Sequence, residues 1–302
     1  MNYSGALTRR LRQLRRVATA STRRPMWHNG VVVPTHWWDG HPNFGDDLTP
    51  WLLPNYGILP IHRVATRARL AGVGSILEFL PSDWDGVVWG SGLMRGEPHP
   101  LPRAQVLAVR GHLTRDLIGA PEDVALGDPG ILVARHRPRP RLRWDVALVP
   151  HGHHRSHVPF LSLAEAAGYR VHVVDVHQTA ERVVREIAAS GAVISTSLHG
   201  IVTADAYGIP AVWTTLEPPL GGGSFKFHDY ESVVTPGATR FVRFSAGMSL
   251  AELVSSASAA PRATVEASCN ALEASAALLP QALNSPARFP QGLLRVLAGR
   301  RA

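Results

Sequence analysis

The sequence predicts an α/β protein with two doubly wound, Rossmann-like lobes that face each other across a cleft. Short apolar runs alternate with amphipathic stretches along most of the chain, which is typical of βα units and parallel sheets. A Pro/Arg-rich run, RHRPRPRLR at 135–143, divides this alternation into two series. The chain has 302 residues, 45% of them hydrophobic, and is therefore long enough for two cores.

The first series contains four strand candidates and two clear helix candidates. Asp46 is positioned to cap a helix over 47–55, and Gly111 and Gly119 bracket a helix over 112–118. The expected strands are 31–34, 86–89, 106–109 and 124–126.

The second series repeats the pattern without any detectable sequence repeat. Its expected strands are 146–149, 170–174, 192–195 and 211–213, and its expected helices are 161–167, 180–189 and 201–207. An Ala/Ser/Leu-rich stretch over 249–279 predicts a closing helix that packs back on the body. We therefore divide the chain into a basic N-terminal tail, a first lobe, a linker, a second lobe, and a closing helix with a basic tail (1–24, 25–134, 135–143, 144–248 and 249–302).

Composition excludes several classes of protein. The single cysteine, Cys269, rules out an internal disulfide framework, and no apolar run reaches the roughly 20 residues that span a bilayer. No apolar core follows the Arg-rich start, so we expect no secretory signal peptide and a cytoplasmic protein.

The net charge of +8 is unevenly distributed. Residues 1–24 hold seven arginines and no acid, and three more arginines follow position 294, which leaves residues 25–294 at −2. Leu7, Leu11, Leu14 and Val17 fall at helical spacing among the first arginines. This segment is expected either to lie on an anionic membrane leaflet or to be a disordered, solvated tail.

Ligands of doubly wound sheets bind at the carboxyl ends of the strands, so the loops there are the candidate site. After the first strand, Asn43, Gly45 and Asp46 either make a turn with an N-cap or hold an anion at a helix N-terminus. Ser91 lies in a Gly-Ser-Gly turn that lets the backbone approach a ligand. Asp128, in the turn Gly127-Asp128-Pro129-Gly130, is interpreted as structural.

Two cationic residues are candidate anion ligands. Arg110 ends a strand, where its fork of donors suits a carboxylate or phosphate, although an inter-lobe salt bridge is the alternative. Lys226 is the only lysine beside 30 arginines and follows the glycine run 221–223, which indicates a mobile segment. A lysine retained in so Arg-rich a chain is a candidate for a specific role.

Histidines mark the second lobe. His151 opens the cluster HGHH and is expected to face the ligand, while the absence of cysteine or paired carboxylate partners nearby argues against zinc. Ser197 and His199 stand where a strand gives way to a helix, so His199 is expected in the cleft, with a core histidine as the alternative. Convergence of Arg110, His199 and Lys226 predicts a receptor for a small, multiply charged anion and not for nucleic acid.

Seven motifs, taken in order, resemble the polysaccharide pyruvyl transferase family, exopolysaccharide type. The resemblance covers about residues 28–232 and departs from the family mainly at Gly152, where an aromatic residue is more usual. The motifs are NFGDDLTPWLL, VWGSGL, VRGHLTRDLIG, LGDPGILV, VPHGHH, ISTSLHGIVTADAYGIPAVW and KFHDY.

The resemblance implies a fold like that of GT-B glycosyltransferases and a defined reaction. Such enzymes move the enolpyruvyl unit of phosphoenolpyruvate onto two sugar hydroxyls as a ketal and release phosphate. It further implies that Arg110, His199 and Lys226 contact phosphoenolpyruvate, with no separate cofactor. We interpret His199 as a proton donor and Asp46 as a candidate base.

Two other classes remain open on the sequence. A nucleotide-sugar glycosyltransferase would share the architecture, and a non-catalytic glycan-binding protein would release no phosphate. The acceptor sugar, its hydroxyl pair and whether it is lipid-linked are not encoded in any motif; a lipid-linked acceptor would place the protein at the inner face of the membrane.

Overall fold

The first sheet consists of six parallel strands. The computed structural model describes the backbone of residues 3–297 and the side chains of residues 11–297. Every pairing in this sheet is parallel, and its order requires crossovers on both sides of β1. The strands, in order across the sheet, are β2 (Ile58–His62), β1 (Val31–His36), β3 (Leu70–Ala71), β4 (Val87–Ser91), β5 (Gln105–Val109) and β6 (Ala125–Leu126).

The second sheet has four strands, all parallel as well. In order they are β10 (Ala211–Trp213), β9 (Ser190–Ser195), β7 (Trp144–Val149) and β8 (Val171–Val173). The central strands β7 and β9 contain apolar runs, Val146–Val149 and Ala192–Ile194, because both of their faces are covered there. The prediction of an α/β protein with parallel sheets is therefore confirmed.

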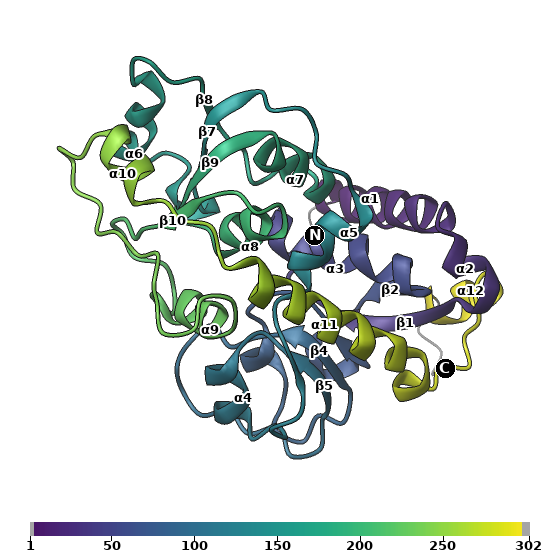
Figure 1. Cartoon of the computed structure of the whole chain (residues 1–302). Helices are drawn as coiled ribbons and strands as arrows, with labels where there is room; N and C mark the ends of the chain where they lie inside the picture. Colours follow the sequence, from purple (N-terminus) through teal and green to yellow (C-terminus); the bar gives the residue numbers. More distant parts are fainter. Residues whose placement is uncertain (1–2, 298–302) are drawn as a thin grey trace.

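Helices cover these sheets and connect them (Figure 1). Helix α11 runs back across the first sheet and packs against β4, β5 and β6, as expected for the closing helix. Its Ser275 hydroxyl accepts a hydrogen bond of 3.0 Å from the indole of Trp89 in β4. The helices are α1 (Tyr3–Ser21), α2 (Arg24–Asn29), α3 (Phe44–Leu52), α4 (His112–Ile118), α5 (Val133–His136), α6 (Val158–Leu161), α7 (Ala180–Ala188), α8 (Leu198–Ala206), α9 (Phe225–Val234), α10 (Leu250–Ser256), α11 (Arg262–Leu283) and α12 (Gly292–Leu297).

A single large hydrophobic cluster joins the two sheets. It includes Val31 of β1, Val193 of β9 and Leu272 of α11, all at most 2% exposed. This cluster contains side chains from both series. The loops that follow the carboxyl ends of the strands in the two sheets are therefore held in a defined arrangement and not on independent bodies.

The N-terminal segment is a packed helix, α1, whose arginines pair with acids of the first lobe. Arg16 donates to Asp47 at 2.6 Å and to Asp39 at 3.2 Å. The disordered tail considered from the sequence is therefore not what residues 3–21 form. Leu7 lies outside the described side chains.

The Pro/Arg run 135–143 connects the sheets. Helix α5 takes up its first two residues, and the remainder is extended and anchored by Arg139, which donates to the carbonyls of Ala188 and Ser190. No helix among residues 3–297 combines the length and apolarity needed to cross a membrane.

Candidate functional site

The candidate site lies where carboxyl-terminal loops of both sheets meet. Asp46 stands in the first turn of α3 after β1, His199 is the second residue of α8 after β9, and Lys226 is the second residue of α9. These three side chains are nearly buried, with exposed fractions of 6%, 9% and 7%. The charges of His199 and Lys226 both act on Asp46, so the structure brings together three of the titratable residues that the sequence singled out.

Asp46 does not cap its helix. Helix α3 begins at Phe44, and its N-cap is Asn43, whose side-chain oxygen accepts from the Gly45 amide at 3.2 Å. The Asn43 amide also donates to the Asp46 carboxylate at 2.5 Å. Our prediction of Asp46 as the cap is therefore wrong, because Asn43 takes that position and leaves Asp46 inside the helix.

The environment of Asp46 favours the neutral form of its carboxyl group. Burial raises its pKa to about 7, while the positive charges of His199 and Lys226 act in the opposite direction. A carboxyl group with such a pKa can hold or release a proton near neutral pH.

Gly45 makes room for the imidazole of His199. A Cβ atom at position 45 would lie only 2.0 Å from His199 Nδ1, so no other residue fits there without moving the ring. The ring of Phe44 meets His199 edge-on, with centroids 6.1 Å apart. The close approach of His199 explains why position 45 is a glycine.

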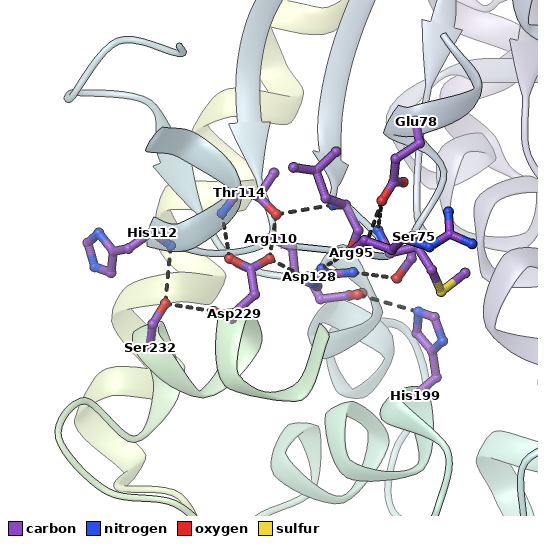
Figure 2. Close-up of polar contacts among 12 residues, drawn as sticks. Ser75, Glu78, Arg95, Arg110, His112, Thr114, Asp128, His199, Asp229 and Ser232 are labelled. Atoms are coloured by element: carbon purple, nitrogen blue, oxygen red, sulfur yellow. Dashed lines mark hydrogen bonds and ion pairs between the residues drawn. The ribbon is translucent and has the colours of Figure 1, made fainter. Parts of the chain in front are cut away.

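Asp128 faces the other nitrogen of the same imidazole, a partnership that the sequence analysis missed. His199 Nε2 lies 3.4 Å from Asp128 Oδ2, and neither buried atom has a hydrogen-bond partner among the described residues (Figure 2). Asp128 Oδ1 meanwhile accepts from the Gly130 amide at 2.8 Å, which is the structural role that we expected. The position of Asp128 at the carboxyl end of β6 is the feature of the sequence that could have indicated this contact.

Lys226 is a buried cation. No carboxylate of the described residues lies within ion-pair distance of Lys226, whose Nζ stands 5.7 Å from the centroid of the Phe227 ring. Burial and the charge of Arg110 lower its pKa to about 8, against the attraction of Asp46. The segment forms helix α9 and is preceded by Gly222 and Gly223, both with positive φ; its mobility stays a prediction.

Arg110 is fully buried and bonded to protein. Its guanidinium donates to Asp229 at 2.8 Å, to Ser75 at 2.6 Å and to the Leu93 carbonyl at 2.5 Å (Figure 2). Asp229 belongs to α9, so this is the ion pair between the two series that we considered as the alternative. Direct contact between Arg110 and a substrate stays a prediction.

The remaining predicted residues differ in their surroundings. Burial lowers the pKa of His151 to about 2, and the charges of Lys226 and His199 act in the same direction. Its neutral ring accepts from the His153 amide at 3.2 Å. Ser197 precedes α8 and is 7% exposed, whereas Ser91 is fully buried and donates to the Gly72 carbonyl.

The described residues contain no group of three or more His, Cys, Asp or Glu side chains set to hold a metal ion. The site combines a carboxyl group that can hold a proton, an imidazole and an ammonium group, all nearly buried. The fold and site together define an α/β protein with a polar, titratable centre between two parallel sheets.

Comparison with known proteins finds a match to the family that the motifs resemble. Residues 101–217 match the family model described as polysaccharide pyruvyl transferase, a segment that contains Arg110, Asp128, His151 and His199. The resemblance drawn from the ordered motifs is thereby confirmed. Asp46 and Lys226 lie outside the matched segment.

Two relatives extend the comparison. The succinoglycan biosynthesis protein ExoV of Rhizobium meliloti (strain 1021) is 30% identical over 210 residues, which are 66% of this chain and 64% of that protein. An uncharacterised protein of Acanthamoeba polyphaga mimivirus is 30% identical over 173 residues, 53% of this chain and 58% of that protein. The aligned segments thus span less than two thirds of each relative.

Proposed function

We propose that the protein is a ketal-forming pyruvyl transferase that acts in the synthesis of exopolysaccharide or another cell-envelope glycan. Its donor would be phosphoenolpyruvate, its acceptor a sugar with two suitably placed hydroxyls, and its second product phosphate. The observation that carries this proposal is the convergence of Asp46, His199 and Lys226 in one nearly buried site. The family match and the succinoglycan relative support it.

The proposed reaction balances as follows. Protonation of C3 of phosphoenolpyruvate makes C2 electrophilic, and the first sugar hydroxyl adds to C2 as its proton leaves to a base. The bond from C2 to the phosphate oxygen then breaks, phosphate departs, and the second hydroxyl closes the ketal with loss of its own proton. Of the two hydroxyl protons, one replaces the proton delivered to C3 and the other leaves with phosphate.

The site residues are suited to these steps. Lys226 places an uncompensated positive charge where a phosphate or carboxylate would bind, and low local polarity strengthens that attraction. His199 would deliver the proton to C3 or to the leaving phosphate, and Asp46, with a pKa of about 7, would accept the hydroxyl proton. Asp128 would hold the imidazole in place.

The architecture fits a GT-B-like arrangement, which we include in the proposal. Two alternatives share it: a nucleotide-sugar glycosyltransferase, and a glycan-binding protein without catalysis. Thermal denaturation with phosphoenolpyruvate and with a panel of sugar nucleotides separates them. We expect only phosphoenolpyruvate to raise the melting temperature; stabilisation by a sugar nucleotide alone would favour the first alternative.

Phosphate release from phosphoenolpyruvate in the presence of hexosides tests the chemistry. We expect His199→Ala and Lys226→Ala each to reduce the rate by at least about a hundredfold. His28→Ala, at an exposed histidine of α2, serves as the control and should retain the wild-type rate. Unchanged release in the first two variants would reject the assignment.

A membrane-proximal location is a separate part of the proposal. Leu11 and Leu14 on α1 are 58% and 63% exposed beside arginines, which is the composition of a helix that lies on an anionic leaflet. Such a contact would suit a lipid-linked acceptor at the inner face of the membrane.

A further inference from the structure

Exposed aromatic side chains are rare in this protein and two of them are neighbours. Among the described tryptophan and phenylalanine residues, only Trp27, Trp38 and Phe79 are exposed by more than a third, at 60%, 39% and 50%. Trp38 and Phe79 are stacked, with ring centroids 6.2 Å apart and an interplanar angle of 30°. Contiguous exposed apolar surface, unlike singly scattered apolar residues, can mark a binding site.

The stack belongs to a row of rings that continues from the first series to the second. His41 meets Trp38 edge-on, with ring centroids 5.7 Å apart, and also stacks on His177, with centroids 5.8 Å apart. Trp38 and His41 follow β1, Phe79 ends the short helix η3 (Leu77–Phe79) after β3, and His177 follows β8. All four rings therefore lie on segments that follow the carboxyl ends of parallel strands, as the residues of the candidate site do.

The row is built next to the proposed catalytic groups. A hydrogen bond from the Trp38 backbone contributes to lowering the pKa of Asp46, which places the start of the row beside that carboxyl group. Gly40 permits the indole to fold over its own loop, since a Cβ there would lie 2.7 Å from the Trp38 ring. At the other end, His177 Nε2 would lie 2.9 Å from a Cβ at Gly152, within the loop that starts at His151.

We propose that the Trp38–Phe79 stack, extended by His41 and His177, binds the acceptor sugar. The carbon-bound hydrogens of a pyranose face pack on aromatic rings, while its hydroxyls need donors and acceptors such as imidazole nitrogens. The stack supplies the first, and the Nε2 atoms of the two histidines supply the second, since Nδ1 of His41 already contacts the Pro42 carbonyl and Nδ1 of His177 contacts Arg155. A sugar seated there would lie beside Asp46, the proposed base for its hydroxyl. The inference rests on the proposed function for the identity of its ligand as an acceptor.

Ligand-observed NMR with p-nitrophenyl glucoside, galactoside and mannoside tests binding without requiring turnover. We expect saturation transfer from the wild-type protein to at least one of these hexosides, and its loss in Trp38→Ala and in Phe79→Ala. Trp27→Ala removes an even more exposed tryptophan on α2 and should leave the signal unchanged. Binding of no hexoside by the wild type, or retained binding in Trp38→Ala, would overturn the proposal.

Kinetics separates the acceptor subsite from the donor site. With the hexoside that binds, Trp38→Ala should raise the acceptor KM by about tenfold or more and leave the phosphoenolpyruvate KM within about twofold. Trp38→Phe, which keeps an aromatic face, should recover most of the affinity. If Trp38→Ala abolishes sugar binding but the wild type releases no phosphate, the subsite stands and the pyruvyl transferase proposal falls. If Trp38→Ala releases phosphate with an unchanged acceptor KM, the pyruvyl transferase proposal stands and the subsite falls.

Discussion

A side chain at position 45 could not coexist with His199 in its present place. The ring reaches within 2.0 Å of where a Cβ would stand, and its Nε2 atom lies 3.4 Å from Asp128 Oδ2. The arrangement confines His199 between one backbone and one carboxylate. Its reactivity should therefore depend on residues that take no part in the chemistry.

Gly45→Ala tests this confinement. We expect a loss of phosphate release of about tenfold to a hundredfold, because the methyl group displaces the imidazole. Gly247→Ala is the matched control, since nothing lies within 4 Å of a Cβ there. Equal activity of the two variants would show that the position of His199 does not limit the reaction.

Asp46 makes stability depend on pH. With a folded pKa of about 7 against an ordinary value of 3.8, the folded protein keeps a proton that the unfolded chain releases. The contribution of Asp46 to the free energy of unfolding is therefore complete below pH 4 and declines as pH rises toward 7. Asp46→Asn removes this titration, so its stability relative to wild type should increase from pH 5 to pH 8 by on the order of 2 kcal/mol.

Chemical denaturation of both proteins at pH 5 and pH 8 measures that difference. Titrating groups away from the site are common to the two proteins and cancel in the comparison, whereas Lys226 does not cancel, because the charge of Asp46 raises its pKa. A difference that is the same at both pH values would mean that Asp46 ionises normally in the folded protein.

At the scale of elements, helix α9 is placed by a buried ion pair. Arg110 at the end of β5 bonds to Asp229, and Asp229 also accepts from the amide and hydroxyl of Thr114 in α4. Lys226 lies one turn earlier on the same helix. The orientation of the only lysine thus follows from a contact between residues 119 positions apart in sequence.

Replacing Arg110 by methionine should therefore be destabilising. We expect Arg110→Met to lower the free energy of unfolding by about 3–5 kcal/mol, because Asp229 would remain buried without its cation. Arg110→Met combined with Asp229→Asn should recover part of the loss. If Arg110→Met keeps wild-type stability and only raises the phosphoenolpyruvate KM, Arg110 is a substrate ligand and not a structural one.

Local pattern predicted many of these elements and missed others for identifiable reasons. All eight strands expected from apolar runs are present within a few residues, and the helix at His112–Ile118 matches exactly where its flanking glycines place it. β2 was missed because Pro60 interrupts it, which an edge strand tolerates, and β3 is only two residues long. Helix α9 is buried on several sides, so its sequence lacks the amphipathic period from which a helix could be predicted.

At the scale of the whole molecule, the charge of the chain is partly neutralised within the fold. Arg12 and Arg16 of α1 pair with Asp39, and Arg16 also reaches Asp47. The helix is thus fastened to the first lobe by its polar side, while Leu11 and Leu14 stay exposed. This combination would present an apolar edge to a membrane without detaching the helix.

Flotation with phosphatidylglycerol vesicles tests the membrane contact. Leu11→Ser combined with Leu14→Ser should weaken binding by about tenfold or more, since two exposed leucines would no longer enter the interface. Leu278→Ser, at a 51% exposed leucine of α11, should bind as the wild type does. Equal binding by all three proteins, or no binding by the wild type, would discard the membrane contact.

Local sequence was sufficient to infer the parallel sheets, the loops that carry the site and the likeness to a family, because hydrophobic period and short motifs are properties of neighbouring residues. It placed Asn43, Asp46, His199 and Lys226 in those loops. It left the choice between ion pair and ligand for Arg110 open and assigned Asp128 to its turn alone. Only the packed molecule decides such partners, since burial, pKa and ion pairing depend on groups that lie far apart in the chain and close together in space.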